Sequence, residues 1–557
     1  MGEVWQRLPG NTLLILLNVF TAVALVFEGY NQGVMGGVSG TADFIRLTKI
    51  GSDGVITDST RQGGIVAAYY FGAMCACFVA GWFGDTYGRK KGVWFGSLWC
   101  ILGGALMSAS QNADMFICSR VITGIGIGFI NTLIPPWVSE LAKSETRGVN
   151  FTFVFISNYI GIILAYWINY GVSFTGRPEF VWRFPLAFMT VPVIIVAVTI
   201  AFLPDSPRWL IANGRRDQAV QVLAKIRGDV QPTDPALVAE LEELEAIVEK
   251  TRHSRNRLWN IAIGRHSGAL HLGRRAWMGF FLMQMLMWSG IMAITTYSGE
   301  LFKVAGFTAS KSAWMGGFCN SLGGVVGTAA AALVIDRWGR IKCLLVGFTT
   351  EGISLYIVAA CLKIAEDTTD NPTKARQLGI TASSFFFVFL WCFCMFIIVP
   401  CFLYPSEIWP QEVRAQGYAF TVFGWATGSG LTTLLIPIML ANIGYGTFLL
   451  FGSFNLIAIP AVYFIYPEVR GRSLEEVNLL FTSSSILVRA NEAEYLKRLA
   501  EAGGQVSVAE RRLLDEVDAL GRDESDMPKT PSSNGVNSLN GEKGVPGVVH
   551  QLDQTSA

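Results

Sequence analysis

The stretch GWFGDTYGRKK, residues 81–91, returns in altered form as VIDRWGRIK at residues 334–342. Each copy places an aspartate four positions before an arginine: Asp85 and Arg89 in the first, Asp336 and Arg340 in the second. Matched segments in separate halves of one chain indicate an internal repeat, in which both halves are built on the same plan.

Two further pairs of segments follow in the same order. SELAKSETRG (139–148) matches SEIWPQEVRAQG (406–417), and in both a glutamate leads an arginine by seven positions: Glu140 and Arg147, then Glu407 and Arg414. PDSPRWL (204–210) matches PEVRGRSLEE (467–476). Three matched pairs in one order are hard to obtain by chance.

Long apolar segments surround these motifs. Of the 557 residues, 51% are hydrophobic and only 15% are charged, which is not the composition of a soluble globular protein. A helix needs about 20 apolar residues to cross a bilayer. The sequence predicts twelve such helices in two groups of six, at 12–36, 63–83, 92–110, 115–137, 150–170, 182–203, 277–299, 312–335, 342–363, 380–404, 416–440 and 445–466.

Lysine and arginine gather in the loops 81–91 and 334–342 and in the gap 204–276. By the positive-inside rule these segments face the cytoplasm, and an even number of spans places both termini there. The predicted organisation is a cytoplasmic N-terminus (1–11), a first six-helix bundle (12–203), a cytoplasmic helical loop (204–276), a second six-helix bundle (277–466) and a cytoplasmic tail (467–557) that ends in disorder. The first apolar run is too long for a cleavable signal peptide.

Several classes of function are disfavoured. The net charge of +1 does not suit a polybasic nucleic-acid binder. The four histidines lie in the loop or the tail, and the ten cysteines fall inside predicted spans, where they suit packing better than zinc binding. Since no nucleophile–base pair, phosphate loop or metal cluster is evident, we expect no enzyme and no cofactor.

The motif set resembles the sugar porter family of the major facilitator superfamily, and the resemblance extends to about residue 480. It implies an all-α membrane protein in the plasma membrane, with two six-helix bundles and a substrate site between them. It also implies a cytoplasmic charge latch, whose inter-helix ion pairs close the inner mouth and part when the mouth opens. In this sequence the latch residues are Asp85, Arg89, Glu140, Arg147, Asp336, Arg340, Glu407, Arg414 and Glu468.

Ionisable residues inside spans are costly and suggest function. Glu28, Arg120 and Glu351 are such residues. The resemblance places Asn31 where proton-coupled members often carry aspartate, and an amide cannot titrate. Glu28 lies three residues earlier on nearly the same helix face, so it either pairs with Arg120 or takes over coupling to a proton. Glu351 is expected to brace its bundle.

Hexose carriers of this family present amides to sugar hydroxyls, and this sequence departs from that pattern. Phe155 replaces a glutamine, Leu286, Met287 and Met292 replace amides of the seventh span, and Phe402 replaces a tryptophan. Each unpaired buried hydroxyl costs about 1–3 kcal/mol, so a hexose should bind poorly. The substrate-binding residues expected from the resemblance are Asn31, Arg120, Phe155, Asn158, Gln284, Trp288, Tyr297, Phe402 and Trp425.

The sequence therefore predicts a transporter that binds a small molecule within the lipid bilayer. Its substrate is either a monosaccharide, polyol or sugar-derived metabolite, or a less hydroxylated, aromatic-like metabolite such as the pyrone kojic acid, in which case export is the expected direction. A sugar sensor that does not transport is a third hypothesis. Whether a proton is coupled, and the oligomeric state, stay open at this point.

Overall fold

The computed structural model describes residues 4–52, 54–141, 147–252, 270–368, 370–410 and 413–513. The first half contains η1 (Val4–Arg7), α1 (Gly10–Val38), α2 (Ala42–Thr48), β1 (Gly51–Ser52), β2 (Val55–Ile56), α3 (Ser59–Tyr87), α4 (Arg89–Ser108), α5 (Ala113–Leu141), α6 (Arg147–Ser173), α7 (Pro178–Phe188), α8 (Thr190–Thr199) and η3 (Ile200–Phe202). Between the halves lie α9 (Pro207–Ala212), α10 (Arg216–Ile226) and α11 (Pro235–Arg252).

The second half contains α13 (Leu272–Leu286), η4 (Met287–Ile291), α14 (Met292–Val304), α15 (Ala309–Cys319), η5 (Asn320–Val326), α16 (Gly327–Trp338), α17 (Arg340–Asp367), α18 (Pro372–Cys392), η6 (Phe393–Ile397), α19 (Ile398–Glu407), α20 (Arg414–Ile443) and α21 (Gly446–Ile465). The tail adds α22 (Leu474–Leu480) and α23 (Val488–Glu501). The segments η4, η5 and η6 are π-helical turns inside longer helices.

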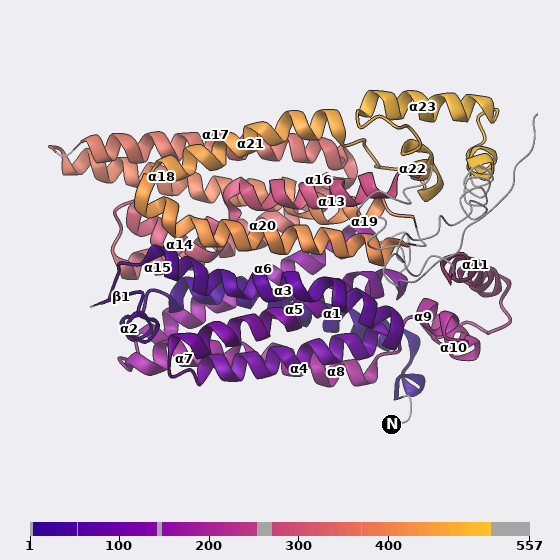
Figure 1. The fold of residues 1–557 in the computed structure, drawn as a ribbon, viewed down its shortest axis with the longest axis horizontal. Coiled ribbons are helices and arrows are strands. Elements are labelled where there is room, and N and C mark those ends of the chain that lie inside the picture. Colours follow the sequence, from indigo (N-terminus) through magenta and orange to yellow (C-terminus); the bar gives the residue numbers. More distant parts are fainter. Residues whose placement is uncertain are drawn as a thin grey trace, which may run out of the picture.

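The long helices run along one axis and form two bundles, one from each half of the chain (Figure 1). In the first bundle α5 packs against α3 and α4, and α1 packs along α6; in the second, α17 packs against α18 and α21. The bundles meet where α3 lies along α20, α1 along α14, and α6 along α16. The predicted all-α architecture of two repeated bundles is confirmed.

Eleven stretches in the described part of the chain are long and apolar enough to cross a membrane. The predicted span 92–110 forms α4, which is not among the eleven. Its first turn is Arg-Lys-Lys, and its glycines lower its hydropathy but allow close packing. A Cβ at Gly96 would lie 2.6 Å from Phe129 of α5, and one at Gly103 would lie 2.2 Å from Thr123. With α4 the two bundles contain the twelve predicted helices.

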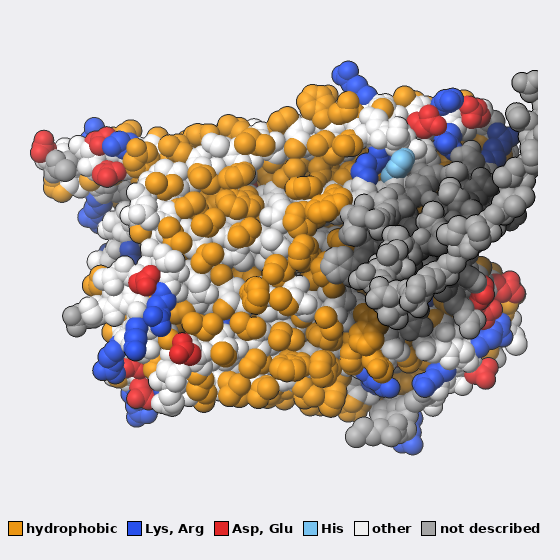
Figure 2. All heavy atoms as spheres, in the orientation of Figure 1, with side chains coloured by type: hydrophobic (Ala, Val, Ile, Leu, Met, Phe, Trp, Pro, Cys, Tyr) orange, Lys and Arg blue, Asp and Glu red, His pale blue; other side chains and the backbone are white. Residues whose placement is uncertain are grey.

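On the face drawn in Figure 2, apolar side chains cover the middle of the molecule, and charged side chains gather toward the two ends of its long axis. Large hydrophobic side chains are exposed on the long helices, among them Phe71, Trp94, Leu333 and Ile457. Such a broad apolar surface suits hydrocarbon rather than water. The fold is that of a protein with many membrane-spanning helices.

The two ends of the molecule differ. One end carries α2 and the short hairpin β1–β2, and we name it the α2 end; the other carries α9, α10, α11 and α22, and we name it the insert end (Figure 1). The predicted loop 204–276 holds α9–α11, but the next long helix begins earlier than expected, at Leu272. Its first turn contains Arg274 and Arg275, which are held by carbonyl groups of the tail and of Ile408.

Candidate functional site

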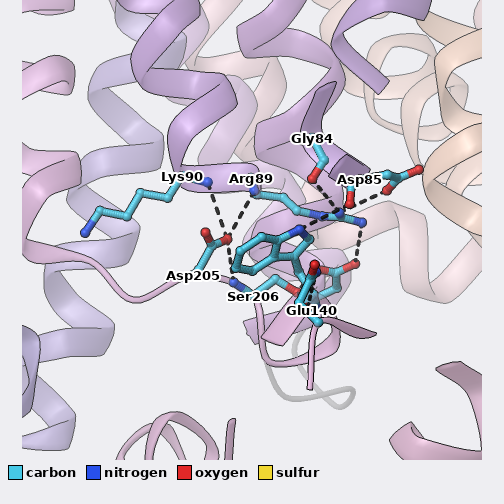
Figure 3. A network of polar contacts seen from close by, with 9 residues as sticks. Gly84, Asp85, Arg89, Lys90, Glu140, Asp205 and Ser206 are labelled. Carbon is cyan, nitrogen blue, oxygen red and sulfur yellow. Dashed lines mark hydrogen bonds and ion pairs between the residues drawn. The ribbon is translucent and has the colours of Figure 1, made fainter. Parts of the chain in front are cut away.

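Arg89 lies at the centre of a polar cluster at the insert end of the first bundle (Figure 3). Its Nη1 lies 2.9 Å from Oδ1 of Asp85 and donates to the carbonyl of Gly84. Its Nη2 lies 3.7 Å from Oε1 of Glu140, and that carboxylate also accepts a hydrogen bond from the Ser206 hydroxyl. One buried arginine therefore joins α3, α4 and α5.

Asp205 caps α4 from far along the chain (Figure 3). Its Oδ1 accepts hydrogen bonds from the N–H groups of Arg89 at 3.1 Å and Lys90 at 3.4 Å. A carboxylate satisfies the free N–H groups at a helix start and interacts favourably with the helix dipole. Burial raises the pKa of Asp205, while Arg89 and the N–H groups favour its ionised form. At Gly88, where φ is 102°, a Cβ would lie 2.4 Å from Oδ2, so the turn requires glycine.

The second bundle repeats this cluster around Arg340. Its Nε and Nη2 donate to the two oxygens of Glu407 at 3.0 and 2.7 Å, and its Nη1 lies 3.6 Å from Asp336. The carboxylate of Glu468 accepts hydrogen bonds from the first two N–H groups of α17, at 3.1 and 3.0 Å. Gly339, with φ of 88°, makes the same close approach to Glu468 that Gly88 makes to Asp205.

Each cluster joins helices of its own bundle, so the ion pairs described here hold the insert end of a bundle together. The first cluster also reaches the other bundle, because Asp85 and Arg89 border a small pocket with Gln416 and Ala419 of α20. The side chain of Arg147 lies outside the described part of the structure. Arg414 begins α20 and donates to the carbonyl of Trp409 at 3.5 Å.

Sequence reasoning misses Asp205, although the signal is present: it follows a proline in PDSPRWL as Glu468 follows one in PEVRGRSLEE. We expect Asp205→Ala to lower the midpoint of thermal unfolding, because the start of α4 loses its acceptor. The loss of such a cap costs about 0.5–2 kcal/mol. Unfolding of the purified protein would be followed with Asp217→Ala, an exposed acid in the first turn of α10, as control. Equal midpoints for all three proteins would contradict the capping role.

A small cavity lies between the bundles. Its wall is formed by α1 and α6 on one side and by α13, η4, α14, η6, α19 and α20 on the other. The lining residues are Glu28, Gln32, Phe155, Asn158, Tyr159, Leu286, Met287, Ile291, Met292, Thr295, Phe393, Ile398, Phe402 and Trp425. Four predicted substrate-binding residues are therefore on this wall: Phe155, Asn158, Phe402 and Trp425.

Glu28 supplies the only carboxylate among these lining residues. Its Oε1 accepts hydrogen bonds from Nδ2 of Asn131 at 2.9 Å and from Nε2 of Gln32 at 3.5 Å. Asn131 is on α5 and was not foreseen from the sequence. Both partners are neutral amides. In the described structure no lysine or arginine lies at ion-pair distance from the carboxylate of Glu28.

The sequence suggests an ion pair between Arg120 and Glu28, but in the structure Arg120 has other partners. Its Nη1 donates to Oδ1 of Asn31 at 3.4 Å, its Nη2 donates to the carbonyl of Val66 at 2.8 Å, and its guanidinium lies 4.9 Å from the ring centre of Tyr69. Of the two alternatives for Glu28, the pair with Arg120 is therefore not formed in this conformation. Neither Arg120 nor Asn31 lines the cavity.

Three predicted substrate-binding residues of the seventh span also lie off the cavity wall. Gln284 donates to a carbonyl of α20 at 2.8 Å, and Tyr297 donates to another at 3.1 Å. The Trp288 ring packs on Phe454 of α21, with centroids 4.8 Å apart. Trp288 lies in the π-helical turn η4, where Gly290 has φ of 106° and the helix departs from regular α-helical geometry.

The bundles contact each other toward the α2 end of the cavity. Nε2 of Gln62 on α3 donates to Oε1 of Glu300 on α14 at 2.7 Å. The Ser298 hydroxyl of α14 donates to the hydroxyl of Tyr166 on α6 at 2.7 Å. These polar contacts cross from one bundle to the other.

They also contact each other toward the insert end, through aromatic rings. Phe155 of α6 meets Phe402 of α19 with ring centroids 4.9 Å apart, and Phe78 of α3 meets Phe420 of α20 at 5.5 Å. The cavity thus lies between two sets of inter-bundle contacts.

Comparisons with known proteins agree with this arrangement. The sugar (and other) transporter family model matches residues 17–481. The chain is 30% identical to the MFS-type transporter oryC of Aspergillus oryzae over 88% of this chain and 89% of that one. It is 28% identical to the sugar transporter STL1 of Saccharomyces cerevisiae, over 94% and 89%, and 29% identical to the quinate permease of Neurospora africana, over 76% and 80%.

Among solved structures, the proton:xylose symporter XylE superposes with a TM-score of 0.70, covering 85% of this chain and all of that one at 20% identity. At that identity the likeness concerns the fold. The family match covers most of the chain and both bundles. The chain therefore belongs to the sugar (and other) transporter family of the major facilitator superfamily, a family of multi-pass membrane transporters and not of enzymes.

Proposed function

We propose that this transporter moves a small ring-shaped metabolite with fewer hydroxyl groups than a hexose, by alternating access of the central cavity. The observation that supports this proposal is that the two sides of the cavity wall differ in polarity. Polar groups lie on the first bundle, at Glu28, Gln32 and Asn158, whereas the second bundle contributes mainly methionine, leucine, isoleucine and phenylalanine side chains.

Such a wall favours a flat molecule with one polar edge. A hexose has hydroxyls around its whole ring, and each one that faces the second bundle without a partner costs about 1–3 kcal/mol. Aromatic faces such as Phe402 and Trp425 stack well on an unsaturated ring. A pyrone such as kojic acid fits both requirements and is the model substrate that we propose.

A monosaccharide or polyol is the second candidate. It is favoured by the similarity to the sugar transporter STL1. Other relatives are named quinate permease and MFS-type transporter, so the family serves varied substrates. The third candidate is a sensor, which would bind a sugar without transporting it.

Uptake in cells that lack their own hexose carriers separates these candidates. Labelled glucose, fructose, xylose and kojic acid would be supplied with and without a protonophore, and surface expression would be measured in parallel. We expect flux of kojic acid and little flux of the three sugars. Hexose or xylose flux above that of kojic acid would contradict the proposal, and binding of a sugar without flux would favour the sensor.

A single substitution should move the preference toward sugars. Phe155→Gln places an amide on the cavity wall beside Asn158, where a hydroxyl can use it. One added hydrogen bond contributes about 1 kcal/mol, so we expect KM for a hexose to fall roughly fivefold. Phe155→Leu removes the ring without adding an amide and is the matched control. An equal effect of both variants would contradict a role for the missing amide.

We further propose that the insert end faces the cytoplasm and that the protein lies in the plasma membrane. The loops 81–91 and 334–342, rich in lysine and arginine, support this orientation. The clusters of Arg89 and Arg340 then keep the cytoplasmic end of each bundle rigid, so that the bundles rock as bodies. The contact of Asp85 and Arg89 with α20 is the part of the latch that would open and close.

A further inference from the structure

A carboxyl group lies inside the second bundle, outside the cavity wall and both arginine clusters. Glu351 of α17 has no exposed surface, and neither of its oxygens makes a hydrogen bond within the described structure. Among the described residues, no lysine or arginine forms an ion pair with it. An ionised carboxylate in such surroundings is strongly disfavoured, so the group requires either a partner or a proton.

The polar side chain that interacts with Glu351 is Ser289 of η4. The Ser289 hydroxyl is itself buried and makes no hydrogen bond of good geometry. Beside it, Asn455 of α21 donates from Nδ2 to the carbonyls of Ser289 and Phe451, both at 2.9 Å, which leaves its Oδ1 unpaired. The helix is irregular at Gly290, so the carbonyl of Ser289 is available to accept the hydrogen bond from Asn455.

Donor hydrogens are scarce around this irregular turn. Both amide hydrogens of Asn455 are already used. The Ser289 hydroxyl carries one hydrogen, whereas three buried oxygens, two on Glu351 and one on Asn455, accept no hydrogen bond in the described structure. A proton on Glu351 supplies a second donor and removes the buried charge in the same step.

The other ionisable groups around Glu351 cannot neutralise a charge on its carboxylate. They come from the four neighbouring segments α6, α18, η6 and α19, and are Tyr159, Cys392, Cys394 and Cys401. Tyrosine and cysteine are neutral or negative in either protonation state, so none of them can act as a counter-charge.

We propose that Glu351 is a proton-binding site, separate from Glu28. When Glu351 is protonated, its hydrogen bond with Ser289 links α17 to the irregular turn of the cavity-lining helix. α17 packs against both η4 and η6, the π-helical turns of two helices that line the cavity. A change in the bend at η4 moves Ser289 relative to Glu351. Binding of the proton and the bend of this helix therefore influence each other.

The infrared C=O stretching band of a protonated, buried carboxylic acid tests this directly. Spectra would be recorded at neutral pH on the full-length protein in lipid nanodiscs, for wild type, Glu351→Gln, Glu28→Gln and Ser289→Ala. We expect the difference between wild type and Glu351→Gln to contain one protonated carboxyl. The same band should persist in Glu28→Gln and change its frequency in Ser289→Ala.

Two results would overturn the proposal. The first is a difference spectrum that shows an ionised carboxylate at Glu351, which is expected if a bound water molecule satisfies the group instead of a proton. The second is a Glu351 band that Ser289→Ala leaves unchanged. If Glu351→Gln does not fold, the difference between wild type and Ser289→Ala still reports the shifted carboxyl band. The measurement needs no substrate, so its outcome is independent of whether kojic acid or a sugar is transported.

Discussion

Replacement of Glu28 by glutamine is expected to abolish accumulation of substrate against its gradient while exchange of labelled for unlabelled substrate continues. Glu28 is the carboxyl group of the cavity wall, and the neighbouring Asn31 cannot titrate. Glutamine keeps the shape of the side chain and a carbonyl for Asn131, which donates at 2.9 Å. We propose that Glu28 carries a coupling proton. Glutamine cannot bind and release a proton, so coupling would be lost while the path for substrate stays.

The measurement is accumulation in proteoliposomes with an imposed proton gradient, together with counterflow without one. Glu366→Gln is the control, because Glu366 is an exposed acid near the end of α17 and lies outside the cavity wall. Accumulation by Glu28→Gln at the wild-type level would show that Glu28 only holds the amides in place. Loss of both accumulation and exchange would instead indicate a role in substrate binding.

Arg340→Ala is expected to give the largest loss of stability among single substitutions in the clusters at the insert end. It removes two hydrogen bonds to Glu407, at 3.0 and 2.7 Å, and leaves that carboxylate near Asp336 and Glu468 without a cation. Hydrogen bonds to charged groups contribute about 1.5–3 kcal/mol each, so we expect a loss of about 3 kcal/mol or more and a corresponding loss of flux.

The control is Arg337→Ala, which removes an exposed arginine of the same loop and should leave stability and flux near wild type. Arg340→Lys keeps the charge but not the two-point contact, so it should lie between wild type and Arg340→Ala. Within the cluster, Glu407→Gln should cost more than Asp336→Asn, because Asp336 is half exposed and 3.6 Å away. The account of the cluster is wrong if Arg337→Ala is as damaging as Arg340→Ala.

The repeat and the spans were predictable because they depend on patterns that are local in sequence. The motif around Arg89 predicts its partner Asp85 four positions earlier, and the apolar runs predict the long helices. Asp205 was harder to find, since its role as a cap for α4 depends on a contact between segments distant in the chain. The match between Pro204-Asp205 and Pro467-Glu468 was the available signal.

The cavity was predictable only in part. Phe155, Asn158, Phe402 and Trp425 lie on its wall as an unbroken helical register implies. Trp288 does not: it lies in the π-helical turn η4, which no local pattern in LMWSGIM distinguishes from a regular turn, and its ring packs on Phe454 of α21. Asn131 escaped notice for a different reason: its contact with Glu28 depends on how α5 packs beside α1.

The central claim is that the two bundles rock about the cavity as rigid bodies, and cross-linking tests it most directly. Cysteines at Gln62 and Glu300, joined by a short bis-maleimide, would tie the bundles together at the α2 end. Cysteines at Ser108 and Arg183, whose side chain donates to the Ser108 carbonyl, tie α4 to α7 inside the first bundle and serve as control. We predict that flux ceases only in the cross-linked Gln62–Glu300 pair. Undiminished flux after complete cross-linking of that pair would contradict the account.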